Sequence, residues 1–343
     1  MVNDEERQNP PGNRRRPTIV DIANEAGVSK GLVSMVLSGA SGPSAATTER
    51  ILAIADRLGY RTNKTAAMLA RRRTRLIGVT TIPSSVFHGE LVEEIQVTAD
   101  AAGYEIVLGS ITASHDERRT IETLIDFRCE ALLLLGPTMP AAHLARLVDT
   151  VPTVCVGRPL DLPAVDVVRA DDKRGIAALV DHLVSLGHQR IAHVDGGKGP
   201  IADVRRRAYR AAMRRHGLTS RVLSGGLTEQ QGADALDALD DAADVTAIVA
   251  FNDRAAVGVL DRLERNGIKV PDNVSVTGFD DSIIARHTRL DLTTVNQAQI
   301  EQARLAVAAA IERLDAGRTE RRETVLPASL VIRGTTGRVP APM

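Results

Sequence analysis

Polar side chains follow three of the short apolar stretches that the sequence predicts as buried strands. Asn252, Asp280 and Gln297 each come within two residues of the end of such a stretch, and Phe87 follows the first one. Ligands of open α/β sheets bind beyond the carboxyl ends of strands, so these side chains could line one pocket. Amide and carboxylate groups offer donors and acceptors suited to hydroxyl groups, and a phenyl ring can stack on a ligand ring. The ordinary alternative is that each one caps a helix or lies in a loop.

The patterns that usually accompany catalysis do not occur in the sequence. It has no Gly-x-Gly-x-x-Gly, no phosphate-loop lysine motif and no Gly-x-Ser-x-Gly, and its 8 histidines lack metal-ligand spacing with cysteines. Residues 196–199, Gly-Gly-Lys-Gly, match neither phosphate motif and are predicted as a loop. Cys129 and Cys155 lie in apolar stretches and are predicted to be free core thiols. We expect a binding protein that is not an enzyme and has no cofactor or metal.

The elements that must position these residues begin at residue 76. From there short apolar strands alternate with helices, as in strand 76–81, helix 89–102, strand 105–108, helix 117–127 and strand 131–135. Apolar strands in this alternation are typical of parallel sheets buried on both faces. About 265 residues of this pattern fit two doubly wound lobes better than one. The apolar runs are far shorter than the ~20 residues of a membrane span.

Three short helices are predicted before this body, at residues 19–26, 30–37 and 46–58. Thr18 is expected to cap the first helix, because an acidic residue stands three positions later as in a capping box. Gly27 is expected to end that helix, because glycine adopts positive φ without strain. The sequence therefore predicts an all-α head of residues 18–62.

The first two of these helices have the spacing of a helix-turn-helix. A small residue on the first helix, a glycine at the turn and an apolar residue after it allow two helices to cross closely. Ser29 is placed to cap the second helix. That helix would project Lys30, Gly31 and Ser34 into a major groove of DNA. An ordinary helical hairpin is the alternative.

Charge is divided unevenly along the chain. The whole chain has 43 Lys+Arg and 43 Asp+Glu, but residues 1–75 carry 13 basic and 7 acidic side chains. The remainder carries 30 and 36, so a basic head precedes an acidic body. This division favours a nucleic-acid-binding module, although charged runs are often only solvated surface. Residues 1–17, with Pro-Pro-Gly and Arg-Arg-Arg, are predicted to be a flexible basic arm.

Motifs in both parts of the chain carry a family resemblance. The head has Thr-Ile-Val-Asp-Ile-Ala-Asn-Glu-Ala-Gly-Val-Ser-Lys at 18–30 and Leu-Gly-Tyr-Arg-Thr-Asn at 58–63. The body has Gly-His-Gln-Arg-Ile at 187–191, Val-Pro-Asp-Asn-Val-Ser-Val at 270–276 and Gly-Phe-Asp-Asp at 278–281. In these motifs and their order, from about residue 18 to residue 337, the chain resembles the lactose/galactose repressor (LacI/GalR) family of transcriptional regulators.

The resemblance implies which residues of the head contact DNA. The family usually has Thr-Val-Ser-Arg after the turn, whereas this chain has Leu32 and Met35 at the Thr and Arg positions. Leu and Met side chains cannot hydrogen-bond to bases, so direct readout should be weaker there or shift to contacts with thymine methyl groups. The DNA contacts implied for the head are Thr18, Ser29, Lys30, Gly31, Ser34 and Met35.

Residues 63–75 are expected to form a hinge helix and linker. In the family this segment becomes helical when two subunits sit together on DNA, and a leucine wedges between base steps in the minor groove. The resemblance assigns this role to Leu69, lets the small Ala66 approach the partner helix, and adds Asn63 to the DNA contacts. A charged linker without a DNA role is the alternative.

The body resembles a periplasmic-binding-protein-like fold, in which two lobes clasp a small molecule. The expected first lobe is 76–158 with 296–326, and the second is 159–295 with 327–337. Arg205 begins Arg-x-x-Ala-Tyr where the family has Arg-x-x-Gly-aromatic, and the family's Arg usually reaches the ligand.

Arg205 therefore joins Phe87, Asn252, Asp280 and Gln297 as an expected effector contact. A sugar is the expected class of effector. With no Trp, 4 Phe and 3 Tyr to cover a sugar face, polyols, nucleosides and small acids stay open.

Together these features predict a DNA-binding transcriptional regulator, usually a repressor, that binds a palindromic operator as a homodimer. A small molecule would switch it allosterically. We expect it in the cytoplasm, without membrane contact, because its charged, proline-rich start is not a secretory signal. Control by a protein partner is one alternative. A solute-binding protein is another, which the head and the missing signal disfavour.

Overall fold

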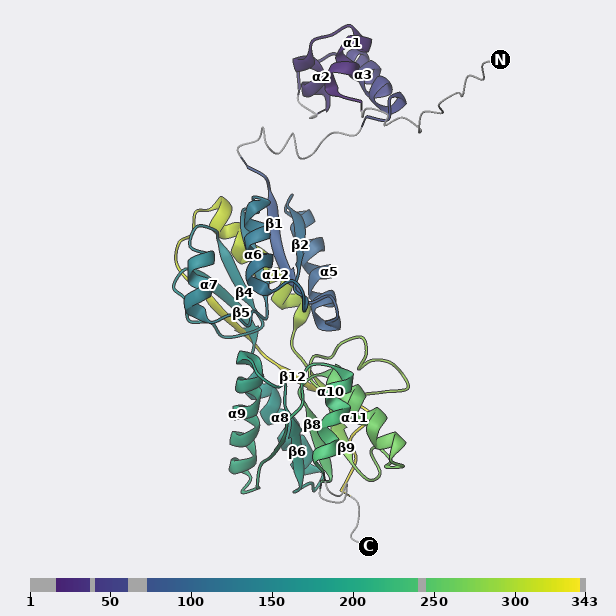
Figure 1. The fold of residues 1–343 in the computed structure, drawn as a ribbon, viewed down its shortest axis with the longest axis vertical. Coiled ribbons are helices and arrows are strands. Elements are labelled where there is room, and N and C mark those ends of the chain that lie inside the picture. The colour runs from purple at the N-terminus through teal and green to yellow at the C-terminus, as the bar shows by residue number, and fades with distance from the viewer. Residues whose placement is uncertain (1–16, 38–40, 61–72, 240–244, 340–343) are drawn as a thin grey trace, which may run out of the picture. The chain divides into compact units, whose positions relative to one another are not determined.

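The computed structural model describes residues 17–37, 41–60, 73–239 and 245–339. The chain divides between Thr74 and Arg75 into two units, here called the head and the body (Figure 1). Most of the predicted arm and hinge, including Asn63, Ala66 and Leu69, lies outside the described residues, so their roles stay predictions. Among the helices that are described, none is long and apolar enough to cross a membrane.

The head contains the three predicted helices. They are α1 (Ile19–Ala26), α2 (Lys30–Leu37) and α3 (Ala45–Arg57). The predicted capping box is present, because the backbone N–H of Thr18 donates to Asp21 Oδ2 over 2.6 Å and the N–H of Asp21 donates to Thr18 Oγ1. The helix ends at Gly27 with a φ of 63°. One side chain from each helix, Ile22, Val33 and Ile51, is fully buried in the shared core.

The N-terminal lobe of the body is built on a six-stranded sheet in the order β11-β5-β4-β3-β1-β2. All of its neighbouring strands are parallel. The strands are β1 (Leu76–Thr81), β2 (Glu105–Ser110), β3 (Ala131–Leu135), β4 (Thr153–Val156), β5 (Val165–Ala170) and β11 (Glu323–Leu326). The helices that pack on it are α5 (Val86–Ala101), α6 (Glu117–Asp126) and α12 (Gln299–Asp315), and α7 (Ala141–Leu147) packs against α6.

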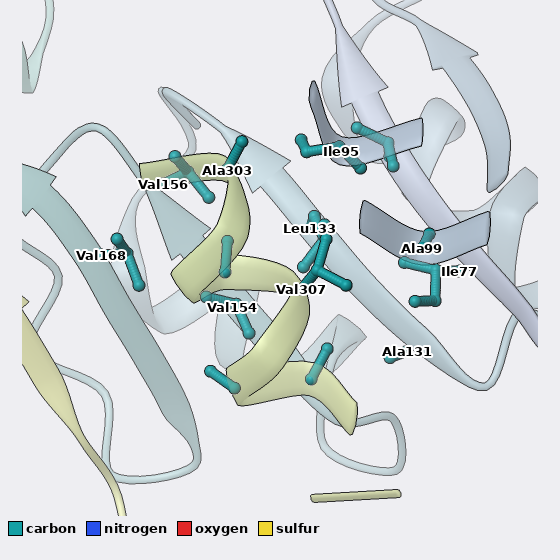
Figure 2. Close-up of a cluster of buried hydrophobic side chains, with 14 of the residues drawn as sticks. Ile77, Ile95, Ala99, Ala131, Leu133, Val154, Val156, Val168, Ala303 and Val307 are labelled. Atoms are coloured by element: carbon teal, nitrogen blue, oxygen red, sulfur yellow. The ribbon is translucent and has the colours of Figure 1, made fainter. Parts of the chain in front are cut away.

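The core of this lobe explains why its central strands are continuous apolar runs. Every residue of β1, β3 and β4 is buried, as expected for parallel strands covered on both faces. Figure 2 shows side chains of these strands meeting those of α5 and α12. The labelled residues include Ile77, Leu133 and Val154 of the sheet, Ile95 and Ala99 of α5, and Ala303 and Val307 of α12.

The C-terminal lobe has a four-stranded parallel sheet in the order β7-β6-β8-β9. Its strands are β6 (Ile191–Val194), β7 (Arg221–Leu223), β8 (Ala247–Ala250) and β9 (Ser275–Thr277). Alternate residues of β8 face opposite cores: Val249 packs with α8 (Asp172–Ser185) and α9 (Pro200–Arg215), and Ile248 packs with α11 (Asp253–Arg265). Beside α11 lie α10 (Glu229–Asp234) and a 3-10 turn (Ala235–Ala238). A short antiparallel pair, β10 (Thr294–Asn296) and β12 (Ser329–Val331), completes the body.

Two lobes of parallel sheets confirm the predicted fold, but two boundaries differ. The expected division after residue 158 is wrong, because β5 pairs with β4 and joins the sheet of the first lobe. The alternation of strands and helices cannot tell which sheet a strand enters. The helix expected at 89–102 begins earlier, at Val86, because the Ser85 hydroxyl accepts a hydrogen bond from the backbone N–H of His88 over 3.2 Å.

Candidate functional site

A cavity of about 230 Å³ opens at the carboxyl ends of strands from both lobes. Phe87, Arg205, Asn252, Asp280 and Gln297 all line it, so the structure brings the five expected effector contacts to one place. Residues just beyond β1, β3, β4, β6, β8 and β9 form its wall. This is where open α/β sheets place their ligands.

Arg205, on α9, is almost fully buried, and contacts with neighbouring residues hold its guanidinium group in place. Its Nε donates to Asp172 Oδ1 over 2.7 Å, and its Nη1 donates to the carbonyl oxygen of Phe251 over 2.7 Å. The guanidinium carbon lies 3.7 Å from the centre of the Phe279 ring, a cation–π contact. Within the described part of the chain, Nη2 has no hydrogen-bond partner, so it remains a donor for a ligand.

Asp280 faces Arg205 across the cavity wall. Its Oδ1 lies 4.0 Å from Arg205 Nη1 and accepts a hydrogen bond of 2.7 Å from Gln297 Nε2. Burial raises the pKa of Asp280 well above its usual range, the neighbouring Asp253 carboxylate adds to this, and Arg205 opposes it. Its φ of 128° is one that residues other than glycine rarely adopt, and such strain gathers at ligand-binding positions.

The loop that carries Asp280 is anchored by Asp253. This buried carboxylate accepts hydrogen bonds from the Ser282 backbone and hydroxyl, both 2.8 Å, and from the Thr294 hydroxyl over 2.6 Å. Burial raises the pKa of Asp253 to about 6. Asp253 therefore ties the segment after β9 to β10, which carries Gln297 just beyond its end.

Gln297 and Asn252 differ in how many of their side-chain polar atoms already have a hydrogen-bond partner. Gln297 keeps its Oε1 without a hydrogen-bond partner among the described residues. Asn252 is a helix cap as well as a lining residue: its Oδ1 accepts from the Ala255 backbone over 2.8 Å, and its Nδ2 donates to the Leu227 carbonyl over 3.2 Å. Phe87 lies in the first turn of α5, half-buried against the core of the first lobe.

Further lining residues carry polar side chains that the sequence does not single out. Among them are His88, Thr138, Lys198 and Arg254. His88 directly follows Phe87, which is the one signal that could have found it. The other three lie in loops or after a cap, where side-chain type alone says little.

In the head, α2 presents the expected DNA contacts on one side. Ser29, Lys30, Gly31, Ser34 and Met35 are all exposed, whereas Val33 and Val36 are buried. Leu32 packs against the core of the head, so the position where the family usually has Thr is used for packing here. Thr18 is half-buried, and its hydroxyl donates to Asp21.

The two predicted free thiols are buried in the body, as expected from their apolar surroundings. Burial raises the pKa of Cys129 to about 11 and that of Cys155 to about 12, so both stay protonated and inert.

Comparisons with known proteins agree with this two-part architecture. The family "Bacterial regulatory proteins, lacI family" matches residues 18–63, and "Periplasmic binding protein-like domain" matches residues 180–336. The HTH-type transcriptional regulator AscG of Escherichia coli (strain K12) is 30% identical over 312 residues, which cover 88% of this chain and 93% of AscG.

Two solved structures extend the comparison. A transcriptional regulator CelR–cellobiose complex is 29% identical, with a TM-score of 0.70, and covers 93% of this chain and 100% of its own. A lac repressor dimer bound to operator and the anti-inducer ONPF is 26% identical, with a TM-score of 0.80, and covers 94% and 100%. These relatives are transcriptional regulators rather than enzymes. The resemblance seen in the motifs is thus confirmed, and the chain belongs to the LacI family of DNA-binding transcriptional regulators.

Proposed function

We propose that the chain binds a palindromic operator as a homodimer and changes its affinity for that operator when a single-ring sugar occupies the cavity. The observation that carries the sugar response is the pairing of Arg205 with Asp280 at the cavity wall. Support for the dimer and the operator comes from the lac repressor relative, and support for a sugar comes from the CelR–cellobiose complex. Such a DNA-binding regulator would act in the cytoplasm.

The polar groups of the cavity favour a neutral ligand that carries hydroxyl groups. The Arg205 charge is already balanced by Asp172, so Arg205 does not need an anion to neutralise it. Arg205 Nη2 can donate, and Asp280 Oδ2 and Gln297 Oε1 can accept, which together match hydroxyl groups. A volume of about 230 Å³ is small against the roughly 300–1,000 Å³ of drug-sized sites, which favours one ring.

For the head we propose that the exposed face of α2, with Ser34, enters the major groove, and that Thr18 and Lys30, at the start of α2, contact the DNA backbone. The hinge contacts proposed for Asn63, Ala66 and Leu69 would bend the DNA at the centre of the operator. Ligand binding in the body would alter the pairing of the two hinges, which couples the two sites.

The experiment that tests the sugar response is a thermal-shift screen of the full chain against D-glucose, D-galactose, D-ribose, D-xylose and cellobiose. A ligand at 100 times its dissociation constant adds about 2.7 kcal/mol of stability. We expect a shift with at least one monosaccharide and a clearly smaller shift with that sugar in Asp280→Asn. If every sugar leaves the melting temperature of the native chain unchanged, the sugar response is wrong and control by a protein partner becomes the better proposal.

A further inference from the structure

His88 contributes a hydrogen-bond donor of fixed polarity to the cavity. The backbone N–H of Ile82 donates to His88 Nδ1 over 3.1 Å. Because an amide N–H can only donate, Nδ1 must accept, and the proton of the neutral ring must lie on Nε2. The ring is anchored just beyond β1, in the first turn of α5, and lines the cavity.

The Nε2 end of this ring is open toward the ligand space. A Cβ placed on Gly136, just beyond β3, would lie 3.7 Å from His88 Nε2, which is an ordinary contact distance, so Nε2 lies beside Gly136 at the end of β3. No described residue accepts a hydrogen bond from Nε2. Burial lowers the pKa of His88 to about 4, so the ring stays neutral at ordinary pH and offers one N–H.

Thr138 contributes an acceptor of fixed polarity to the same wall. Its hydroxyl donates to Glu117 Oε2 over 2.8 Å, and the same oxygen accepts from the backbone N–H groups of Thr138, over 2.9 Å, and Met139, over 3.0 Å. With its hydrogen held by the buried Glu117 carboxylate, the Thr138 hydroxyl can only accept from the cavity.

The two groups come from neighbouring parts of the fold. His88 follows β1 and Thr138 follows β3, and these strands are adjacent and parallel, so their carboxyl ends meet at one edge. Gly136, which lies beside His88 Nε2, is two residues before Thr138. The wall of the first lobe therefore presents one donor and one acceptor to the cavity that Arg205 and Asp280 line from the second lobe.

We propose that His88 and Thr138 together recognise one hydroxyl group of the effector. His88 Nε2–H donates to the hydroxyl oxygen, and the hydroxyl hydrogen is donated to Thr138 Oγ1. A group that only accepts, such as an ether or a fluorine, loses the second bond, and a hydrogen atom loses both. This inference rests on the proposed sugar response and specifies which chemical feature of the sugar the first lobe reads.

The binding test is calorimetric titration of the full chain with the monosaccharide that the screen identifies. Analogues that replace one ring hydroxyl at a time by fluorine or by hydrogen are titrated in parallel. At one ring position we expect affinity to fall by about tenfold for each hydrogen bond lost, in the order hydroxyl, fluorine, hydrogen.

The variants assign each bond to its residue. In Thr138→Val the hydroxyl and fluoro compounds should bind equally at that position, whereas Thr138→Ser should keep the native difference. In His88→Phe, which retains a ring of similar shape, the fluoro and deoxy compounds should bind equally. Native discrimination that survives in both Thr138→Val and His88→Phe overturns this inference alone. Failure of the native chain to bind any of the five sugars overturns the sugar response and this inference with it.

A second measurement does not depend on the ligand. In ¹⁵N-labelled full chain, the long-range proton–nitrogen spectrum of the His88 ring, identified by its loss in His88→Phe, should show a proton on Nε2 between pH 5.5 and 7. A proton on Nδ1, or a doubly protonated ring in this range, overturns the fixed donor.

Discussion

Arg254 Nη1, on the C-terminal lobe, donates a hydrogen bond of 2.6 Å to the carbonyl oxygen of Ser84, on the N-terminal lobe. Both residues lie at the wall of the cavity. The same guanidinium is held by Glu229, which accepts from its Nε over 2.8 Å and from its Nη2 over 2.6 Å. A bidentate pair of this kind fixes the direction of the arginine, so the bond to Ser84 joins the lobes beside the ligand space.

Replacing Arg254 should let the effector leave faster. Arg254→Ala removes the bond across the lobes, and we expect the dissociation rate of the bound sugar to rise about tenfold, since a charged hydrogen bond contributes roughly 1.5–3 kcal/mol. Stopped-flow release measures this rate. Arg262→Ala is the matched control, because Arg262 is on the same helix but pairs with Asp237 of its own lobe. Equal release rates in the two variants would refute a role for the Arg254 bond.

Asp280→Asn should separate effector binding from folding. The substitution keeps the shape of the side chain but removes a carboxylate whose pKa burial raises, so the free energy of unfolding at pH 7 should not fall. Sugar affinity should drop at least about tenfold, because Asn offers one acceptor and disturbs the Gln297 contact. Operator binding without sugar should be unchanged. An effector response of native strength in this variant would remove Asp280 from the binding site.

Low pH should reduce the free energy of unfolding of the body, because unfolding exposes His193 to protonation. Burial lowers the pKa of His193 to about 4, and its Nδ1 donates to the Val249 carbonyl over 2.8 Å. The unfolded chain takes up this proton near pH 6.5 and the folded chain only near pH 4, so stability is lost as pH falls through this window. The loss for this group between pH 7 and pH 5 is on the order of 2 kcal/mol.

Protonation of Asp253 should partly offset this loss of stability at low pH. Burial raises its pKa to about 6, so the folded chain takes up the proton before the unfolded chain does and gains stability as pH falls from about 6 toward 4. Urea unfolding at pH 7 and pH 5 should therefore show a smaller acid loss in His193→Asn than in the native chain, and a larger one in Asp253→Asn. The same pH dependence in all three proteins would contradict both assignments.

Lys30→Ala should weaken DNA binding without regard to sequence. Lys30 is exposed at the start of α2, and a lysine that contacts a phosphate adds about one unit to the slope of log affinity against log salt. Operators selected from random duplexes should be inverted repeats, and the variant should bind all of them more weakly, with a shallower slope. Arg118→Ala, at an exposed cation of the body, is the control. Native affinity and slope in Lys30→Ala would exclude α2 as the recognition helix.

The sequence predicts best the strands whose residues are all buried. β1, β3 and β4 are buried along their whole length, so each is an unbroken apolar run. β11 alternates between exposed and half-buried residues at the edge of the sheet, so its four residues do not form the unbroken apolar run that marks the buried strands. The assignment of β5 to the first sheet depends on pairing partners, which a local pattern does not contain.

Prediction from the sequence reaches the same limit for the residues that line the cavity. The positions of Asp280 and Gln297 follow from the rule that ligands bind beyond strand ends, because that rule needs only the order of the elements. The polarity of His88 depends on the direction of one backbone N–H, that of Ile82, and the polarity of Thr138 depends on a carboxylate 21 residues away in the sequence. These hydrogen-bond partners of His88 and Thr138 are fixed by the tertiary structure, and no local sequence pattern identifies them.

The order of the strands along the chain also has a consequence for synthesis on the ribosome. The sheet of the C-terminal lobe is complete once β9 has emerged at Thr277, whereas the N-terminal lobe still lacks α12, which covers its core, and its edge strand β11. The sheet of the lobe that begins first is therefore completed after the other sheet, and its exposed apolar face must wait for residues 299–326. A nascent chain stalled before that point carries an open core, which makes it a substrate for chaperones.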